Sequence, residues 1–276
     1  MPTPLLPTSS STLSSCTWDA RALIHHDPLI RKKKLHILNN LTRSTSQLAL
    51  QEVHGTLADM ELFFHHFDNT CYLGYSPSSS RDTGGVVTLI SRHAYPSSTT
   101  FSSVVLIPGR ALRTSIEYNG KRQIHYNIHN HDIPPIDLKN LFDHLRIDIN
   151  ISKEQPEVTT IIVAGDFNFL APGDIPLPLT RPIAPEDLQA VGACPNRWNE
   201  ILSQFTEIQP IERTHFHAAG DSLSRIDRIY IFAPAWIFTK LKRSGTILND
   251  PIKLHAQRIS DHAPVCVRIS SPSPMA

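Results

Sequence analysis

Short runs of apolar residues, many of them β-branched, recur along the chain and are bounded by Gly, Pro, Asp or Ser. Runs of this length and composition are typical of buried β-strands. They predict strands over residues 47–53, 85–91, 103–108, 123–129, 159–164, 226–232 and 264–269. So many strands with only a few helices favour two packed sheets flanked by helices.

Other segments follow a helical period. In residues 31–41, Leu35, Leu38 and Leu41 share one face of the predicted helix, and the basic run RKKK occupies the other. We expect this run to be solvated, because charged residues at a helix start are usually in water. Further helices are predicted over residues 136–149 and 186–191.

The ends of the chain differ in composition from its middle. Residues 1–16 are rich in Ser, Thr and Pro and predict a disordered tail, followed by one domain over 17–270 and a short tail over 271–276. The first residues lack the features of a signal peptide, which favours a nuclear or cytoplasmic protein over a secreted one. The apolar runs are much shorter than the roughly 20 residues that span a bilayer, so no membrane association is expected.

Composition changes this picture little. The 276 residues include 26 Lys and Arg against 25 Asp and Glu, so no overall basic charge announces a nucleic-acid partner. The four cysteines form no CxxC pair, which argues against a structural zinc site and a disulfide framework. Histidine pairs at 129/131 and 215/217 would each share one face of a strand. They could bind zinc, but one functional histidine beside a surface one is the favoured interpretation.

Acidic, amide and histidine side chains gather where the predicted strands begin or end. Singly, each group fits a turn, a cap or a surface ion pair. Together they favour a site for a hard cation and a phosphate, because Mg²⁺ prefers oxygen ligands and phosphoryl transfer needs positioned charge. The residues are Gln51, Glu52, Asn127, His129, Asp166, Asn168, Asp227, Ser260, Asp261 and His262.

Four of these segments, LALQEVHG, VAGDFN, SRIDRIYI and SDHAPV, occur in an order that resembles a known family. The resemblance is to the endonuclease/exonuclease/phosphatase superfamily, the group of DNase I and exonuclease III, over about residues 17–270. The last two segments are most similar to endonuclease domains of LINE-type, non-LTR retrotransposons. The resemblance implies an α/β four-layer sandwich, with two mixed β-sheets face to face between helices. It also implies phosphodiester cleavage that depends on Mg²⁺ or Mn²⁺.

The resemblance also implies roles for single residues. Glu52 would be the principal Mg²⁺ ligand, with Asp261 near the metal. Asp166 would hold and deprotonate the attacking water, and Asn168 would orient water and phosphate.

Around the phosphate, His262 would contact the scissile group and Asp227 would orient that imidazole. Thr214 fits a phosphate-contacting threonine of the family, and a buried structural threonine is an equally good interpretation. The predicted phosphate or substrate contacts are Asn127, Thr214, Ser260 and Arg225.

Two positions depart from the retrotransposon pattern. Asp19 replaces the Asn of the opening Trp-Asn motif. It can ligate the metal, but it adds negative charge beside Glu52, which puts activity in doubt. His129 stands where apurinic and retrotransposon endonucleases carry Tyr, and Asn-x-His is more like DNase I, deadenylases and sphingomyelinase relatives. A catalytic role is retained, since either side chain donates a hydrogen bond, but the substrate is left open.

Three hypotheses follow. The first is a monomeric Mg²⁺-dependent endonuclease that nicks DNA. The second is a phosphoesterase with the same site that acts on RNA tails or small phosphoesters. The third is a catalytically weakened copy that still binds nucleic acid. For the first, the basic residues predicted to contact phosphates are Arg110, Arg113, Arg225, Arg228 and the run at 240–243.

Overall fold

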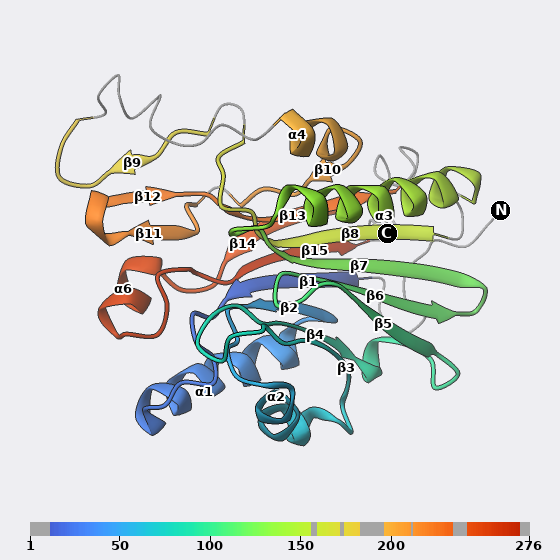
Figure 1. The fold of residues 1–276 in the computed structure, drawn as a ribbon, viewed down its shortest axis with the longest axis horizontal. Coiled ribbons are helices and arrows are strands. Elements are labelled where there is room, and N and C mark those ends of the chain that lie inside the picture. Colours follow the sequence, from blue (N-terminus) through green and yellow to red (C-terminus); the bar gives the residue numbers. More distant parts are fainter. Residues whose placement is uncertain are drawn as a thin grey trace, which may run out of the picture.

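A computed structural model describes residues 12–155, 159–171, 174–182, 196–210, 212–233 and 242–270. Two six-stranded β-sheets lie face to face, and helices cover the outer face of each, so the molecule has four layers (Figure 1). The predicted α/β sandwich is therefore confirmed. No helix in these ranges combines the length and apolar character that crossing a membrane requires.

The first sheet has the order β14-β15-β1-β2-β4-β3, in which only β1 and β2 run parallel. Its outer face is covered by α1 and α2, which lie below it in Figure 1. The bounds are β1 (Thr12–Asp19), α1 (Pro28–Ser44), β2 (Gln47–Gln51), α2 (Leu57–Phe64), β3 (Cys71–Ser76), β4 (Val86–Ser91), β14 (Lys242–Ile247) and β15 (Val265–Ser270).

The second sheet has the order β10-β13-β8-β7-β6-β5, with β7 and β8 parallel, and carries α3 and α4 on its outer face. Its bounds are β5 (Thr100–Ile107), β6 (Ala111–Tyr118), β7 (Lys121–His129), α3 (Pro135–Glu154), β8 (Thr159–Asp166), α4 (Asn196–Leu202), β10 (Thr206–Glu207) and β13 (Asp227–Phe232). A small sheet and one short helix lie at one edge of the sandwich. They are β9 (Leu177–Pro178), β11 (His215–His217), β12 (Ser222–Ser224) and α6 (Pro251–Ala256). Single 3₁₀ turns cover His65–Phe67, Arg92–Ala94 and Ala218–Gly220.

Apolar side chains fill the space between each helix layer and its sheet. Leu38 and Leu41 of α1 pack with Trp18 against the first sheet. On the second sheet, the ring of Trp198 meets Phe142 and Phe167 edge-on, at centroid distances of 4.9 and 5.4 Å. Burial of such large side chains is the main stabilisation of each helix on its sheet.

Between the two sheets, an apolar cluster is joined by a layer of buried amides. Asn127 on β7 donates to the Val87 carbonyl at 2.9 Å and accepts from Gln51 Nε2 at 2.6 Å. Gln47 donates to Gln123 across the same interface at 2.9 Å. Because a buried polar group without a partner is costly, these bonds hold the two sheets in one relative position.

The predicted tail over 1–16 is corrected in its last part. Residues 12–16 belong to β1, which lies inside the first sheet between β15 and β2. The polar sequence is tolerated there because the hydroxyls of Ser14 and Thr17 have partners. Ser14 Oγ accepts from the Ser46 amide at 2.9 Å. Predictions for residues 1–11, 186–191 and 271–276 lie outside the described ranges.

The expectation that the whole basic run of α1 is solvated is also wrong. Lys34 is buried, and its ammonium donates to the carbonyls of Ala20, at 2.7 Å, and Ala22, at 3.0 Å. Burial lowers the pKa of Lys34 to about 8. This lysine therefore holds the chain segment that follows β1 against α1.

Candidate active site

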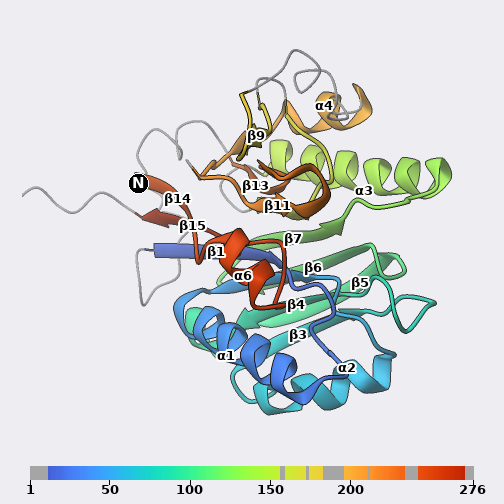
Figure 2. The same ribbon diagram turned by 90° about the vertical axis from the view of Figure 1, so that its left-hand side faces the viewer.

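The register of the strands brings residues from separate motifs together at one edge of the sandwich. Asp166 on β8 pairs with His129 on β7 and with Asp227 on β13, so the three lie side by side. In the first sheet, Asp19 at the end of β1 pairs with Gln51, directly before Glu52. Figure 2 looks onto this edge, where α6 and β11 also lie.

Local backbone geometry at this edge is unusual. A Cβ on Gly165, which has a φ of +155°, would lie 1.8 Å from the Ile128 carbonyl oxygen, so only glycine allows the approach of β7 to β8. Glu52 and Asn168 have left-handed backbones, with φ of 50° and 51°. Such conformations are costly for residues other than glycine and often occur at functional sites.

Two buried carboxylates form the centre of the cluster. Atoms of Asp19, Asp166 and His262 that could ligate a metal lie within 4.8 Å of one another. Asp166 accepts hydrogen bonds from the amide and the side chain of Asn168, at 2.9 and 2.8 Å. Burial raises the pKa of Asp19, and burial with the charges of Asp227 and Asp19 raises the pKa of Asp166 to about 7. A bound cation would relieve this crowding of negative charge.

His262 has a carboxylate partner behind its ring. Its Nδ1 lies 3.0 Å from both carboxylate oxygens of Asp227. Burial works against protonation, but the charges of Asp227, Asp19 and Asp166 outweigh it and raise the pKa of His262 well above its ordinary value. The imidazole is therefore held as a cation, with Nε2 directed away from Asp227.

Glu52 is surrounded by basic groups. Its oxygens accept from Arg110 at 3.1 Å, from His54 at 2.7 Å and from the Gly84 amide at 3.0 Å, and one lies 2.9 Å from His129 Nδ1. Burial opposes ionisation, but the bonds from His129 and His54 hold the pKa of Glu52 below its usual range. In this arrangement His129 lies between Glu52 and the two aspartates, with Nε2 about 4 Å from each, at 4.0 Å from Asp19 and 3.9 Å from Asp166.

Three of the predicted phosphate contacts are instead held by the protein interior. Asn127 is used in the amide layer between the sheets and is 1% exposed. Thr214 accepts from the backbone amides of Ile226 and Asp227, both at 3.2 Å, so the buried structural threonine is the interpretation that fits. Ser260 donates to the Asp19 carbonyl at 2.8 Å. These side chains position their neighbours and present no free group to a phosphate.

The predicted phosphate-binding arginines also have internal partners. Arg225 and Arg228 both pair with Asp174. Arg113 forms two hydrogen bonds with Asp148, at 2.7 and 2.9 Å. Acidic partners inside the fold therefore balance the charges of Arg225, Arg228 and Arg113, and their contact with phosphates stays a prediction. Arg110 pairs with Glu52, and of the run at 240–243 only the last two residues are described, within β14.

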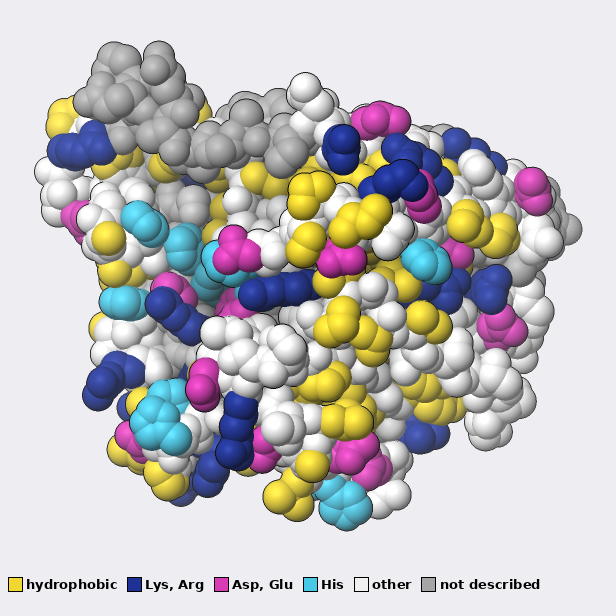
Figure 3. Space-filling view, in the orientation of Figure 1, with side chains coloured by type: hydrophobic (Ala, Val, Ile, Leu, Met, Phe, Trp, Pro, Cys, Tyr) yellow, Lys and Arg dark blue, Asp and Glu magenta, His cyan; other side chains and the backbone are white. Residues whose placement is uncertain are grey.

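The basic surface near the cluster is built from other residues. A hollow of about 530 Å³ next to Asp261 is lined by Arg21, His25, His54 and Arg258. A second hollow, of about 830 Å³, shares His25 and His54 with the first and adds Arg31 of α1 and Arg81 of the β3–β4 connection. Asp82 and Asp59, which pairs with Arg81, also line it. We call the two together the basic groove. Histidine, basic and acidic side chains gather at the edge that holds the cluster, on the left in Figure 3.

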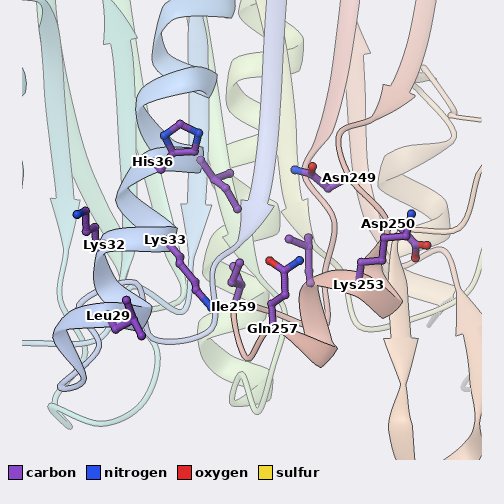
Figure 4. Close-up of a pocket in the computed structure, with 11 residues that line it drawn as sticks. Leu29, Lys32, Lys33, His36, Asn249, Asp250, Lys253, Gln257 and Ile259 are labelled. Carbon is purple, nitrogen blue, oxygen red and sulfur yellow. The ribbon is translucent and has the colours of Figure 1, made fainter.

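The sequence carried only weak signals for some of these residues. His54 lies within the QEVHG segment, but Arg21 and Arg258 belong to no motif. A separate hollow, of about 670 Å³, lies between α1 and α6, with Lys32, Lys33 and Lys253 at its rim (Figure 4). It contains none of the predicted site residues.

Comparison with known proteins agrees with this architecture. A model of the endonuclease/exonuclease/phosphatase family matches residues 48–262. An AP endonuclease from Leishmania major superposes with a TM-score of 0.70 at 14% identity, covering 98% of this chain and 93% of that one. The 3'-5' exonuclease NExo from Neisseria meningitidis superposes with a TM-score of 0.60 at 20% identity, covering 92% and 98%.

TDP2 from D. rerio, in complex with a single-stranded DNA product, superposes with a TM-score of 0.56 at 16% identity, covering 95% and 100%. At these identities the solved structures show a shared fold. No curated protein matches the chain in sequence. The family match spans more than half of the chain and contains the residues of the cluster from Glu52 to His262. The chain belongs to the endonuclease/exonuclease/phosphatase family.

Proposed function

We propose that the protein is a nuclease that cuts phosphodiester bonds within DNA with the help of a divalent cation. The observation that carries the proposal is the buried group of Asp19, Asp166 and His262, backed by Asp227, beside the basic groove. The carboxylates suit a cation, the imidazolium suits a phosphate, and the groove suits a polyanion.

The donor set fits Mg²⁺ or Mn²⁺. Asp19 and Asp166 would hold the ion through carboxylate oxygens, with Glu52 as a third candidate ligand once its basic partners move aside. The crowding of these buried carboxylates supports this assignment, since a cation would replace repulsion by attraction. When bound, the ion would neutralise phosphate charge and favour ionisation of water.

The side chains of the protein supply the remaining chemistry. Asp166, whose orientation is fixed by Asn168, accepts the proton of the attacking water. His262 donates from Nε2 to a phosphate oxygen, and Asp227 keeps the ring charged and oriented. His129 adds a second donor on the side of Asp19 and Glu52.

The sequence of the last two motifs adds a finer hypothesis, a nicking enzyme of the retrotransposon type. A second candidate function keeps the same site for RNA tails or small phosphoesters, which the Asn-x-His at 127–129 favours. The basic groove supports the polymer over the small ester, because its arginines extend beyond the cluster. The DNA product held by one structural neighbour supports DNA.

The test is nicking of supercoiled plasmid by the purified protein with Mg²⁺, compared with EDTA. Asp166→Asn and His262→Ala are expected to lose activity, while the exposed control Arg268→Gln on β15 keeps it. Nicking that persists in EDTA or in both variants would contradict the proposal. Poly(A) and a phosphocholine ester, assayed beside duplex DNA, decide the substrate. Faster turnover of either one would favour the second function.

A further inference from the structure

A second set of possible metal ligands lies beside the cluster and uses a residue that the proposed function does not. His215, at the start of β11, faces Asp261 and His262. We propose that His215, Asp261 and His262 form a separate site for a transition-metal ion such as Zn²⁺, and that its occupation switches off hydrolysis by taking Nε2 of His262. The binding stands on geometry alone, whereas the inhibition rests on the proposed function.

The ligand atoms are close to the spacing that zinc requires. His215 Nε2 lies 3.8 Å from Asp261 Oδ2, and His262 Nε2 lies 4.0 Å from Asp261 Oδ1. Ligands at about 2.0–2.1 Å from a tetrahedral ion lie about 3.3 Å apart. The potential ligand atoms of the three residues all lie within 4.8 Å of one another, so side-chain movements of at most about 1.5 Å would bring them to this spacing around an ion.

Both imidazoles are already oriented for binding. Nδ1 of His262 lies 3.0 Å from the carboxylate of Asp227, and Nδ1 of His215 lies 3.1 Å from the hydroxyl of Ser224. Partners of this kind on the second ring nitrogen are a regular feature of metal-binding histidines, because they fix the ring and direct Nε2 to the ion. Here both Nε2 atoms are on the side of Asp261.

An independent observation comes from Asp261. Its Oδ1 is buried and has no hydrogen-bond partner among the described residues, a costly state for a carboxylate oxygen. Its Oδ2 pairs with Arg21, whose side chain is 59% exposed and is therefore free to move into water. An ion would satisfy the orphaned oxygen and replace Arg21.

The backbone around the three ligands is held by long-range hydrogen bonds. His215 and His262 form an isolated antiparallel bridge, the Phe216 amide donates to the Asp261 carbonyl at 2.8 Å, and the Ala263 amide donates to the Thr214 carbonyl at 2.7 Å. The ligands thus come from two rigidly paired segments, which limits the entropy lost on binding.

The two ion sites differ in chemistry and share one side chain. Two imidazole nitrogens and one carboxylate suit Zn²⁺, Co²⁺ or Ni²⁺, whereas the carboxylates of Asp19 and Asp166 suit Mg²⁺. His262 belongs to both groups. A metal ion bound through Nε2 of His262 displaces the proton of this nitrogen to solvent. The donor that the proposed reaction needs is then lost, so occupation of the nitrogen-rich site and hydrolysis exclude each other.

The first measurement is binding of Zn²⁺ to the metal-free protein by isothermal titration, with the absorption spectrum of Co²⁺ as a report on nitrogen ligands. We expect one ion per chain and a rise in melting temperature. His215→Gln should weaken binding more than about tenfold, as expected for loss of a ligand. His217→Gln is the matched control, because His217 lies on the same strand with its ring 6.2 Å from that of His215.

Several outcomes would overturn the site. Equal affinity in His215→Gln and the wild type would do so, and so would equal weakening by His217→Gln. Loss of Zn²⁺ binding in Asp166→Asn but not in His215→Gln would assign the ion to the carboxylate group. The melting temperature of each variant without metal checks that it is folded, and Asp261→Asn provides a second substitution at the site.

The inhibition is tested separately in the presence of Mg²⁺. Zn²⁺ should suppress nicking in the wild type and in His217→Gln, and should suppress it at least tenfold less effectively in His215→Gln. Binding without inhibition of an active enzyme would reject the switch and keep the site. If no variant or wild-type protein nicks DNA, the proposed function fails, while the titration still decides whether the site exists.

Discussion

Single residues at the strand ends decide what the cluster can do. Asp19 places a carboxylate where the retrotransposon pattern has an amide, and the structure puts it within 4.8 Å of potential ligand atoms of Asp166 and His262. Its Oδ1 accepts from the Arg21 amide at 2.9 Å, which leaves Oδ2 for an ion. The substitution therefore changes the charge of the cluster without removing a donor atom.

We predict that Asp19→Asn raises the Mg²⁺ concentration for half-maximal nicking by roughly tenfold, because one charged ligand is lost. The measurement is a Mg²⁺ titration of plasmid nicking. Higher turnover of the variant at saturating Mg²⁺ would instead favour the third hypothesis, in which Asp19 is the lesion of a weakened copy.

Asp227 acts through His262. Asp227→Asn removes the charge that raises the pKa of His262, so less of the imidazole is protonated near neutral pH. We expect turnover to fall by about 10²–10⁴-fold and the alkaline limb of the pH–rate profile to move to lower pH. A profile that stays in place while the rate falls would show that Asp227 has a structural role only.

His125 lies in the interior between the sheets, and burial lowers its pKa to about 3 from 6.5. The unfolded chain therefore binds a proton below pH 6.5 that the folded chain rejects, so stability present above pH 6.5 is lost as the pH falls. By pH 5 the loss is about 2 kcal/mol. Urea unfolding between pH 7.5 and 5 measures it, and His125→Leu should flatten this dependence. An equal slope in the variant would exclude His125 as its source.

At the scale of elements, the two sheets are joined by side chains that sequence motifs presented as functional. Asn127 precedes the catalytic candidate His129 by two residues, so strand alternation puts both side chains on one face of β7. In the structure Asn127 bonds to β2 and β4. Its neighbour two positions on reaches the site because β7 ends there.

We predict that Asn127→Ala lowers the free energy of unfolding by about 2–4 kcal/mol, since Nε2 of Gln51 and the Val87 carbonyl both lose their hydrogen bond to Asn127. Urea unfolding at neutral pH measures the change. At a temperature at which the variant is folded, its affinity for DNA should equal that of the wild type. Weaker DNA binding by the folded variant would instead support the prediction that Asn127 contacts a phosphate.

For the whole molecule, the small net charge does not reflect the local electrostatic potential near the cluster. The overall charge is only +1, yet arginines and histidines line the basic groove next to the cluster. Meanwhile Arg113 and Arg228 are neutralised by acidic partners inside the fold. The field that a DNA backbone would meet therefore depends on which arginines remain at the surface.

We predict that DNA binding weakens with salt and that Arg31→Gln and Arg258→Gln each reduce the salt slope by about 1. The measurement is the dissociation constant for duplex DNA across a range of salt concentrations. Arg268→Gln, an exposed arginine outside the groove, should leave the slope unchanged. An equal change of the salt slope in all three variants would show that the DNA does not bind in the groove.

Local sequence patterns predict the strands with continuous β-branched runs, such as β4, β8 and β13, and the helices α1 and α3. They also predict most of the residues that meet at the edge, because strand ends in one order converge in one place, whereas Asn127 lies in the amide layer between the sheets. These signals are local: they depend on side-chain period and on neighbours within a few positions.

Other features depend on contacts between segments that are distant in the sequence. Ser14 lies in a core strand because Ser46, far away in the chain, satisfies its hydroxyl. Lys34 is buried because carbonyls after β1 accept hydrogen bonds from its ammonium. Arg225 forms an ion pair with Asp174, and an isolated backbone bridge brings His215 beside His262. Whether a polar or charged side chain can bind a ligand depends on the partners that folding brings to it from distant segments. These partners cannot be inferred from the neighbouring residues in the sequence.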